Sequence, residues 1–148
     1  MIVHAPLPGR VLDLAEVPDQ VFAAGIVGPG LALDPDRRGE VTAVAPVDGR
    51  VVKLHPHAFV LVAADGRGVL VHLGIDTVQL AGDGFTVHAA EGQEVATGTP
   101  LITFEPDVVA AGGRSPVCPV LALDGGAEQV HRLASAVVTA GDPLFDWA

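Results

Sequence analysis

The chain has 148 residues and one cysteine, and 49% of its residues are hydrophobic. This length suits one domain with a sizeable core, expected to span 1–148, and the 18 glycines and 12 prolines indicate many short strands broken by turns. The formal net charge of −10 argues against a nucleic-acid partner, whose phosphates would be repelled, and suits a partner that is basic.

Apolar runs separated by Gly- and Pro-rich turns predict short strands along the whole chain. In chain order these strands are expected at 10–14, 31–33, 41–45, 50–54, 58–63, 68–73, 101–104, 119–123 and 137–139. Short helical turns are expected at 18–24, 76–80, 107–111 and 127–133, with Asp76 and Asp107 as candidate N-caps. The pattern predicts an all-β fold, an antiparallel sandwich or flattened barrel with short helical turns.

Two segments recur along the sequence. A-P-L-P-G-R-V-L-D-L at 5–14 returns as A-P-V-D-G-R-V-V-K-L at 45–54, and V-A-T-G-T-P-L at 95–101 returns as V-T-A-G-D-P-L at 138–144. Each unit is predicted to be a strand, a glycine turn and a second strand. Two copies without capping ends indicate a duplicated β motif in one domain rather than a solenoid.

Two histidines stand at the ends of neighbouring apolar runs. His72 lies in V-L-V-H-L-G-I-D, and His57 opens H-A-F-V-L-V. A titratable ring among Val and Leu is costly to desolvate unless it has a partner. Because the loop at 63–67 predicts an antiparallel hairpin, we expect the two rings to approach each other at one edge.

A pair of imidazoles can carry phosphoryl chemistry. A neutral imidazole is a nucleophile near pH 7 and can form a covalent phosphoryl intermediate, if one ring nitrogen is free and the other is held by an acceptor. The second ring can donate to the phosphoryl oxygens, and phosphoryl transfer needs little beyond positioning and charge stabilisation. A satisfied core histidine is the alternative for either ring.

Other chemistries fit the sequence less well. A catalytic zinc site wants three protein ligands, and His57 and His72 with Asp76 lack the H-x-H or H-E-x-x-H spacing. No G-x-S-x-G elbow is present for a serine hydrolase. A biotinyl- or lipoyl-type carrier, suggested by E-G-Q-E-V-A-T-G-T-P-L, would need a lysine at a hairpin tip, and Lys53 is the single lysine.

Several segments carry a family resemblance. They are A-P-L-P-G-R-V at 5–11, V-P-D-Q-V-F-A at 17–23, I-V-G-P-G-L-A-L at 26–33, V-A-P-V-D-G at 44–49, H-A-F at 57–59, V-H-L-G-I-D-T-V-Q-L at 71–80, G-D-G-F at 82–85, E-G-Q-E-V at 91–95 and G-D-P-L at 141–144. With these the chain resembles the glucose-family EIIA domain of the bacterial phosphoenolpyruvate-dependent sugar phosphotransferase system. The resemblance covers nearly the whole chain, and V-H-x-G-I-D-T-V is its most specific part.

The resemblance implies roles for three residues. His72 would accept a phosphoryl group from the phosphocarrier protein HPr, as a tele-phosphohistidine, and pass it to a cysteine of the EIIB domain. His57 would stabilise the phosphoryl group, and Asp76 would be the flanking acid. No cofactor is required, and the family's fold would be an all-β sandwich built from a duplicated hybrid motif.

The resemblance also implies partners. An apolar surface around the histidines would dock HPr and EIIB. Its residues would be Val21, Phe22, Ile26, Val27, Leu70 and Val78. The alternative for some of these six is an ordinary place in the core. Some family members bind regulatory targets, and some share a zinc ion with a partner, for which His57 and His72 would be the ligands. A zinc endopeptidase with the same β architecture is the alternative function.

Two positions depart from the family pattern. His55 stands where a threonine usually orients the H-A-F histidine, so His55 becomes a possible third imidazole at the site. Pro29 replaces the aspartate of I-V-G-D-G and removes one acid near the docking surface. Neither departure changes His72 or Asp76.

The remaining candidates are expected to be structural. His4, His88 and His131 should be exposed or structural, and Cys118 should be a buried small hydrophobe. The sequence contains no apolar run long enough to span a membrane and no secretory signal pattern at its start, and one cysteine suits a reducing compartment. We therefore expect a cytoplasmic protein.

Overall fold

Three antiparallel sheets form the framework of the molecule. The computed structural model describes residues 1–148. The largest sheet has eight strands, in the spatial order β13 (Val137–Val138), β2 (Gly9–Asp13), β3 (Gly30–Asp34), β11 (Cys118–Ala122), β7 (Gly68–His72), β6 (Ala58–Val62), β5 (Gly49–His55) and β9 (Glu94–Val95). One three-stranded sheet has the order β1 (Ile2–His4), β14 (Pro143–Trp147) and β12 (Val130–Arg132). The other has the order β4 (Val41–Val44), β10 (Pro100–Phe104) and β8 (Phe85–Val87).

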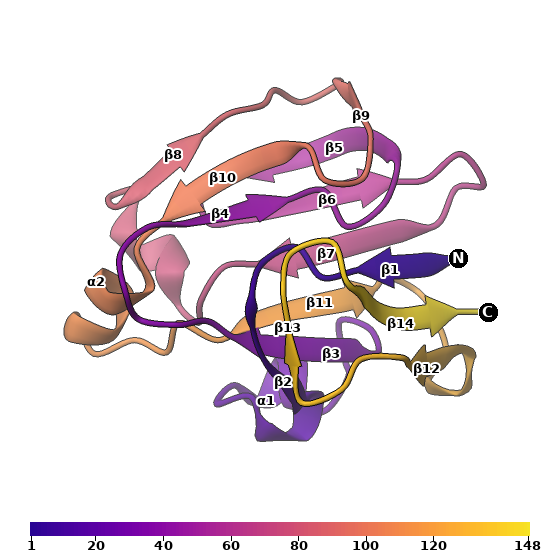
Figure 1. Cartoon of the computed structure of the whole chain (residues 1–148), viewed down its shortest axis with the longest axis horizontal. Helices are drawn as coiled ribbons and strands as arrows, with labels where there is room; N and C mark the ends of the chain where they lie inside the picture. Colours follow the sequence, from indigo (N-terminus) through magenta and orange to yellow (C-terminus); the bar gives the residue numbers. More distant parts are fainter.

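No sheet closes on itself, so the fold is a sandwich rather than a barrel (Figure 1). The core lies between the sheets, where side chains from all three meet: Val3 and Phe145 come from one small sheet, Phe104 from the other, and Phe59 and Val71 from the large one. Side chains alternate between the core and the outer face along each strand. In β7, Val69 and Val71 are fully buried, whereas Leu70 and His72 are on the outer face and half-buried.

The sequence repeats correspond to a duplicated arrangement of strands. Gly9 of β2 pairs with Val138 of β13, and Gly49 of β5 pairs in the same way with Val95 of β9. Two turns repeat as well: Ala5 N–H donates to Asp142 O and Ala45 N–H to Thr99 O. The two halves place β13 and β9 at opposite edges of the large sheet. The expectation of a duplicated antiparallel β sandwich is confirmed.

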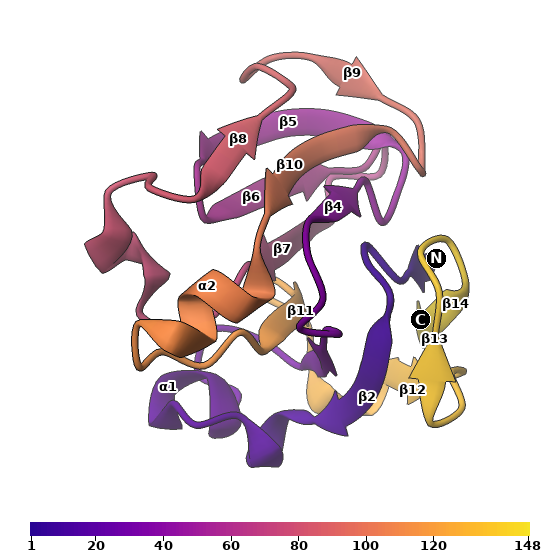
Figure 2. The ribbon, with the colours of Figure 1, turned by 60° about the vertical axis from the view of Figure 1, so that its left-hand side comes forward.

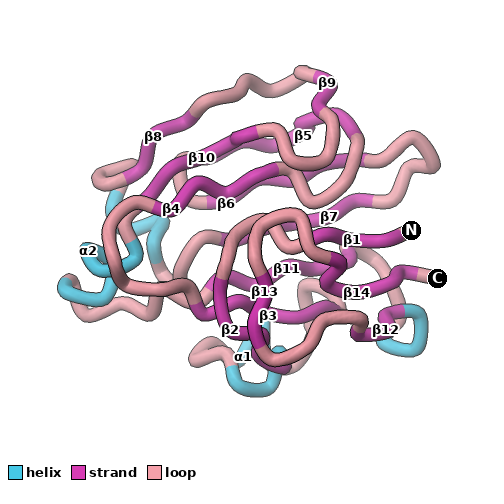
Figure 3. Tube along the Cα trace, in the orientation of Figure 1, coloured by secondary structure: helices cyan, strands magenta, loops and turns pink.

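Helical segments are short and lie at the periphery (Figure 3). They are η1 (Leu14–Glu16), α1 (Gln20–Ala23), η2 (Thr77–Leu80), α2 (Pro106–Ala111) and η3 (Ala127–Gln129). Figure 2 shows α1 and α2 on the same side of the molecule. A second, smaller apolar cluster lies against α1 and is formed by Leu12, Val17, Ala32, Ile75 and Val117, with Phe22 packed on it.

The expected strands all form, with bounds that differ by one or two residues. Five strands were not predicted, namely β1, β8, β9, β12 and β14. The helical expectation for 127–133 is correct only for Ala127–Gln129, because Val130–Arg132 pairs with β14 as β12. Consequently His131 lies on a strand and not in a helix.

Of the two candidate N-caps, Asp76 occupies the cap position of its helical turn and Asp107 does not. Asp107 is inside the first turn of α2, and Glu105 occupies the cap position because Pro106 begins the helix. Asp76 does precede η2, but its backbone is left-handed (φ 59°) and its side chain makes no capping hydrogen bond.

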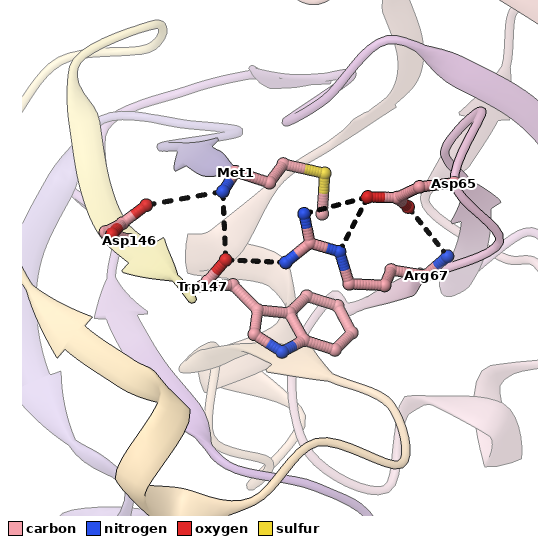
Figure 4. A network of polar contacts seen from close by, with 5 residues as sticks. All are labelled: Met1, Asp65, Arg67, Asp146 and Trp147. Carbon is pink, nitrogen blue, oxygen red and sulfur yellow. Dashed lines mark hydrogen bonds and ion pairs between the residues drawn. The ribbon is translucent and has the colours of Figure 1, made fainter.

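The two ends of the chain are joined by a polar network (Figure 4). The amino group of Met1 donates to the carbonyl of Trp147 at 2.9 Å and lies 3.4 Å from Asp146. Arg67, from the β6–β7 loop, donates to the same carbonyl at 2.6 Å and lies over the Trp147 ring at 5.1 Å. Asp65 pairs with Arg67 at 2.8 Å, and its pKa is lowered mainly by hydrogen bonds from Arg67.

Candidate functional site

The β6–β7 hairpin brings His57 and His72 together. Ala58 pairs with His72 in the ladder, and the N–H of Leu73 donates to the carbonyl of His57 at 2.7 Å. The ring centroids lie 5.1 Å apart with an interplanar angle of 70°. The expectation that the two rings meet at one edge is confirmed.

One nitrogen of His72 is held by the backbone. Nδ1 lies 2.5 Å from the carbonyl oxygen of Gly74, which can only accept a hydrogen bond. Nδ1 therefore carries a proton, and in the neutral ring Nε2 keeps its lone pair. The ring is thus fixed in the tautomer that a nucleophilic Nε2 requires.

The turn after β7 creates this contact. Gly74 has φ +81°, and a Cβ there would lie 2.6 Å from Cγ2 of Thr77 and 3.2 Å from the carbonyl oxygen of Ser115. Thr77 is fully buried and donates to the carbonyl of Leu73 at 2.8 Å, while the N–H of Ile75 donates to Ser115 O at 2.8 Å. The G-I-D-T segment is therefore anchored on both sides of Gly74.

The environment of His72 favours the neutral ring. Burial lowers the pKa of His72 below its ordinary value, and this effect outweighs the opposing influence of the Gly74 carbonyl, Asp19 and Asp76. Burial also lowers the pKa of His57, helped by the neighbouring charges that His72 and then His55 would carry. Both rings are accordingly neutral near pH 7.

Asp19 is a further residue of the site, which the sequence pattern did not predict. Its carboxylate caps α1 by accepting from Val21 N at 2.9 Å and Phe22 N at 3.3 Å. The capped turn places the Phe22 ring 5.2 Å from the His72 ring. The capping pattern was visible in V-P-D-Q-V-F, but the approach of α1 to His72 depends on tertiary packing.

Asp76 lies four residues after His72 and is exposed. Its negative charge acts on His72 to raise the pKa, less strongly than that of Asp19 does. The charges of the two carboxylates act on His72 from different parts of the fold, the residue that caps α1 and the residue before η2. No hydrogen bond joins the Asp76 side chain to either histidine.

His55 ends β5 and stacks on His57. The ring centroids lie 5.7 Å apart and the planes differ by 21°. The structure thus brings three imidazoles together, from β5, the β5–β6 turn and the end of β7. Pro29, the other departure, lies just before β3 and its carbonyl accepts from Ala122 N at 2.7 Å, so it extends the pairing of β3 with β11.

The six apolar candidates are all at least partly exposed. Val21 is 50% exposed, Ile26 74% and Val78 62%. Phe22, Val27 and Leu70 are half-buried, and none of the six belongs to the fully buried core. Phe22 contacts His72 directly, and Leu70 shares the outer face of β7 with it.

The remaining candidates lie outside this cluster. His88 is exposed just after β8 and bonds Thr103 at 2.7 Å. His4 bonds the Pro46 carbonyl at 3.2 Å, and His131 is exposed on β12. Cys118 is completely buried, and burial raises the pKa of its thiol to about 12. These residues are structural or surface groups, as expected.

The donor set does not build a metal site from this chain alone. No group of three or more His, Cys, Asp or Glu side chains is arranged to hold a metal ion. The zinc endopeptidase alternative lacks the third protein ligand that it requires. On a separate point, none of the helices could span a membrane.

The fold is a duplicated antiparallel sandwich, and its site is a pair of histidines at a partly apolar surface. Known proteins are similar to this chain in sequence and in structure. The family described as "phosphoenolpyruvate-dependent sugar phosphotransferase system, EIIA 1" matches residues 1–127, and the chain belongs to this family of phosphotransferase components. Within it, the chain is a glucose-family EIIA domain. Its structure is similar to that of glucose permease IIA from Mycoplasma capricolum, with a TM-score of 0.89 and 33% sequence identity over 98% of this chain and 94% of that one.

Proposed function

We propose that this EIIA domain carries a phosphoryl group on Nε2 of His72, taking it from phospho-HPr and giving it to a cysteine of an EIIB domain for coupled sugar uptake and phosphorylation. The observation that carries the proposal is the bond between His72 Nδ1 and the Gly74 carbonyl. It leaves Nε2 with a free lone pair, on a ring whose pKa lies below the usual histidine value. The family match and the likeness to glucose permease IIA support the same role.

The transfer balances without a further reactant. The Nε2 lone pair forms a bond to phosphorus while the bond between phosphorus and the donor's atom breaks, and the donor keeps that electron pair. The proton stays on Nδ1 of His72 throughout, hydrogen-bonded to the carbonyl oxygen of Gly74. In the second step a thiolate of EIIB attacks phosphorus, and Nε2 recovers its lone pair. Positioning and charge stabilisation therefore account for the chemistry.

His57 would assist this transfer. Its ring lies 5.1 Å from that of His72, and its neutral form has one N–H that can donate to a phosphoryl oxygen. A neutral donor stabilises the phosphoryl group without pairing so tightly that onward transfer stops. His57 should therefore affect transfer rates more than it affects the ability of His72 to be labelled.

The surroundings suit two successive protein partners. Val21, Ile26 and Val78 expose apolar side chains, and the charges of Asp19 and Asp76 reach His72. An apolar patch with acidic neighbours favours partners that present an apolar face with basic residues at its rim. The net charge of −10 would steer such partners toward the chain.

The transfer proposed here requires no cofactor. A zinc ion shared with a partner would be held by His57 and His72 and would need further ligands, such as a carboxylate, from that partner, since two imidazoles do not complete a zinc site.

The test is a transfer assay with phosphoenolpyruvate, enzyme I and HPr, followed by an EIIB domain. The wild-type chain should acquire an acid-labile phosphate and lose it to EIIB. His72→Gln should acquire none, and His57→Gln should be labelled but pass the group on more slowly. His131→Gln, which changes an exposed histidine on β12, is the matched control and should behave as wild type. An acid-stable phosphate, or labelling that survives His72→Gln, would overturn the proposal.

A further inference from the structure

The His57 ring lacks the kind of anchor that holds His72. His72 is fixed through Nδ1 by the Gly74 carbonyl, but neither ring nitrogen of His57 makes a hydrogen bond to another group of the protein. The backbone of His57 is secured through its carbonyl, which accepts from Leu73 N. The position of the residue is therefore defined, and the plane of its ring must be held by packing.

His55 supplies that packing. Its ring lies nearly parallel to the ring of His57, at 21° and 5.7 Å between centroids, while the His72 ring stands at 70° to it. The His57 ring is thus stacked against His55 and meets His72 at a steep angle. A ring held in this way loses rotation about its side-chain bonds, which a single edge contact would permit.

The local backbone favours this stack. His55 pairs with Ala58 across the β5–β6 hairpin, so residues 56 and 57 form the turn between the strands. Pro56 lies between the two histidines, where its ring restricts φ and biases the preceding residue toward the extended conformation found at the end of β5. The two imidazoles are thereby presented side by side by a stiff turn.

We propose that His55 is a positioning residue for phosphoryl transfer, holding the plane of the His57 ring against His72 by stacking. The proposal rests on the function proposed above and assigns His55 no contact with the phosphoryl group. It requires an aromatic face at position 55 rather than a ring nitrogen. If His55 acted through a hydrogen bond or a charge instead, a ring nitrogen would be required and an aromatic face alone would not be enough.

The variants His55→Phe and His55→Ala separate these requirements. Phenylalanine keeps a flat ring and removes both nitrogens, whereas alanine removes the ring. Because His55 is exposed, neither variant should disturb the core, and far-UV circular dichroism with urea unfolding verifies the fold. His131→Ala, on exposed β12, controls for the loss of any surface histidine.

The assay measures transfer from the phosphorylated chain to EIIB over a range of EIIB concentrations. For His55→Ala we expect kcat to fall between about 3-fold and 10-fold, the range that the strength of an aromatic pair implies, with KM unchanged. His55→Phe and His131→Ala should stay within about 2-fold of wild type, since the stack is kept or untouched. A purely structural role would shift unfolding and KM together with kcat.

A spectroscopic readout tests the stack itself. The readout is the chemical shift of the His57 ring protons in proton–carbon correlation spectra of the unphosphorylated protein. In His55→Ala these shifts should move, because the ring current of the neighbouring side chain is lost. In His55→Phe the ring-current shift should be retained, because an aromatic ring still stacks on His57. The proposal is overturned if His55→Ala transfers at the wild-type rate, or if His55→Phe is as slow as His55→Ala. A wild-type chain that takes no phosphoryl group contradicts instead the function proposed above.

Discussion

The carbonyl oxygen of Gly74 accepts a hydrogen bond from Nδ1 of His72, two residues earlier in the chain, at 2.5 Å. This contact decides which ring nitrogen is free, and it exists because the chain turns back on itself immediately after β7. The turn depends on a left-handed backbone at Gly74 (φ +81°) and again at Asp76 (φ 59°). The chemistry of His72 is therefore linked to the conformation of a few residues that never touch a substrate.

Substituting Gly74 tests this link. Gly74→Ala adds a Cβ that would lie 2.6 Å from Thr77 Cγ2, in a backbone region that L-residues avoid. We expect a loss of about 2 kcal/mol or more in the free energy of unfolding, together with slower phosphorylation as the carbonyl shifts. Urea unfolding and the labelling rate from phospho-HPr measure the two effects.

Gly66→Ala is the matched control for that variant. Gly66 also has a positive φ, +90°, but a Cβ there meets nothing within 4 Å. It should cost about 1 kcal/mol from the backbone alone and leave labelling unchanged. Equal effects of the two substitutions on labelling would contradict the role assigned to the Gly74 carbonyl.

Thr77 anchors the same turn from inside the protein. Its hydroxyl donates to the carbonyl of Leu73 at 2.8 Å, and the side chain is fully buried. Thr77→Val keeps the shape and removes the donor, so we expect a loss of about 1–2 kcal/mol in the free energy of unfolding by urea denaturation. Thr86→Val, at an exposed position of β8 without a side-chain hydrogen bond, should change stability by less than about 0.5 kcal/mol. A smaller effect at Thr77 than at Thr86 would refute the anchoring role.

The lowered pKa values of His57 and His72 predict a pH dependence of stability. In the unfolded chain both groups titrate near 6.5, whereas in the folded protein burial keeps their pKa values lower. As pH falls below about 6.5, the unfolded chain binds protons that the folded chain does not, so the free energy of unfolding should decrease. Well above that pH, where neither the folded nor the unfolded chain protonates these rings, the two histidines should contribute no slope.

Urea unfolding at intervals between pH 5.5 and 7.5 measures this slope. The double variant His57→Gln/His72→Gln removes both groups and should flatten the curve over this interval. A curve as steep as that of the wild type would place the responsible groups elsewhere.

The network at the chain ends predicts a stability effect far from the site (Figure 4). Arg67 donates to Trp147 O, pairs with Asp65 and covers the Trp147 ring. Arg67→Ala should lower the free energy of unfolding by about 1–2 kcal/mol while phosphorylation proceeds normally. Arg38→Ala should be neutral within about 0.5 kcal/mol, because Arg38 is 90% exposed and lies 3.7 Å from Asp36. Similar losses in both variants would mean that the network adds nothing specific.

Much of the fold could be predicted from the sequence, because the apolar runs indicate the longer strands and the two repeats indicate the duplicated motif. The repeats predicted a duplicated β motif, and in the structure Gly9 and Gly49 pair alike, with Val138 and Val95. Edge strands such as β9, with two residues, are too short for a period-two pattern to emerge. β12 was mistaken for a helix because Val130–Arg132 contains no alternation that separates the two structures; its pairing with β14 decides the outcome.

The candidate site was predicted in part for similar reasons. The approach of His57 to His72 follows from a hairpin, which is local in sequence. The contribution of Asp19 depends on the packing of α1 beside the sheet, and the Gly74 contact depends on backbone angles. Neither can be inferred from residue spacing. His55 was noticed as a departure from the family pattern, but its stack on His57 became visible only with the ring planes in place.

The most direct test of the account is to locate the phosphoryl group within the His72 ring. Nitrogen–proton correlation spectra of histidine-labelled protein, recorded before and after incubation with phosphoenolpyruvate, enzyme I and HPr, distinguish the two ring nitrogens. We predict phosphorylation at Nε2 of His72, with the Nδ1 proton retained against the Gly74 carbonyl. Phosphorylation at Nδ1, at another histidine, or at none would contradict the account.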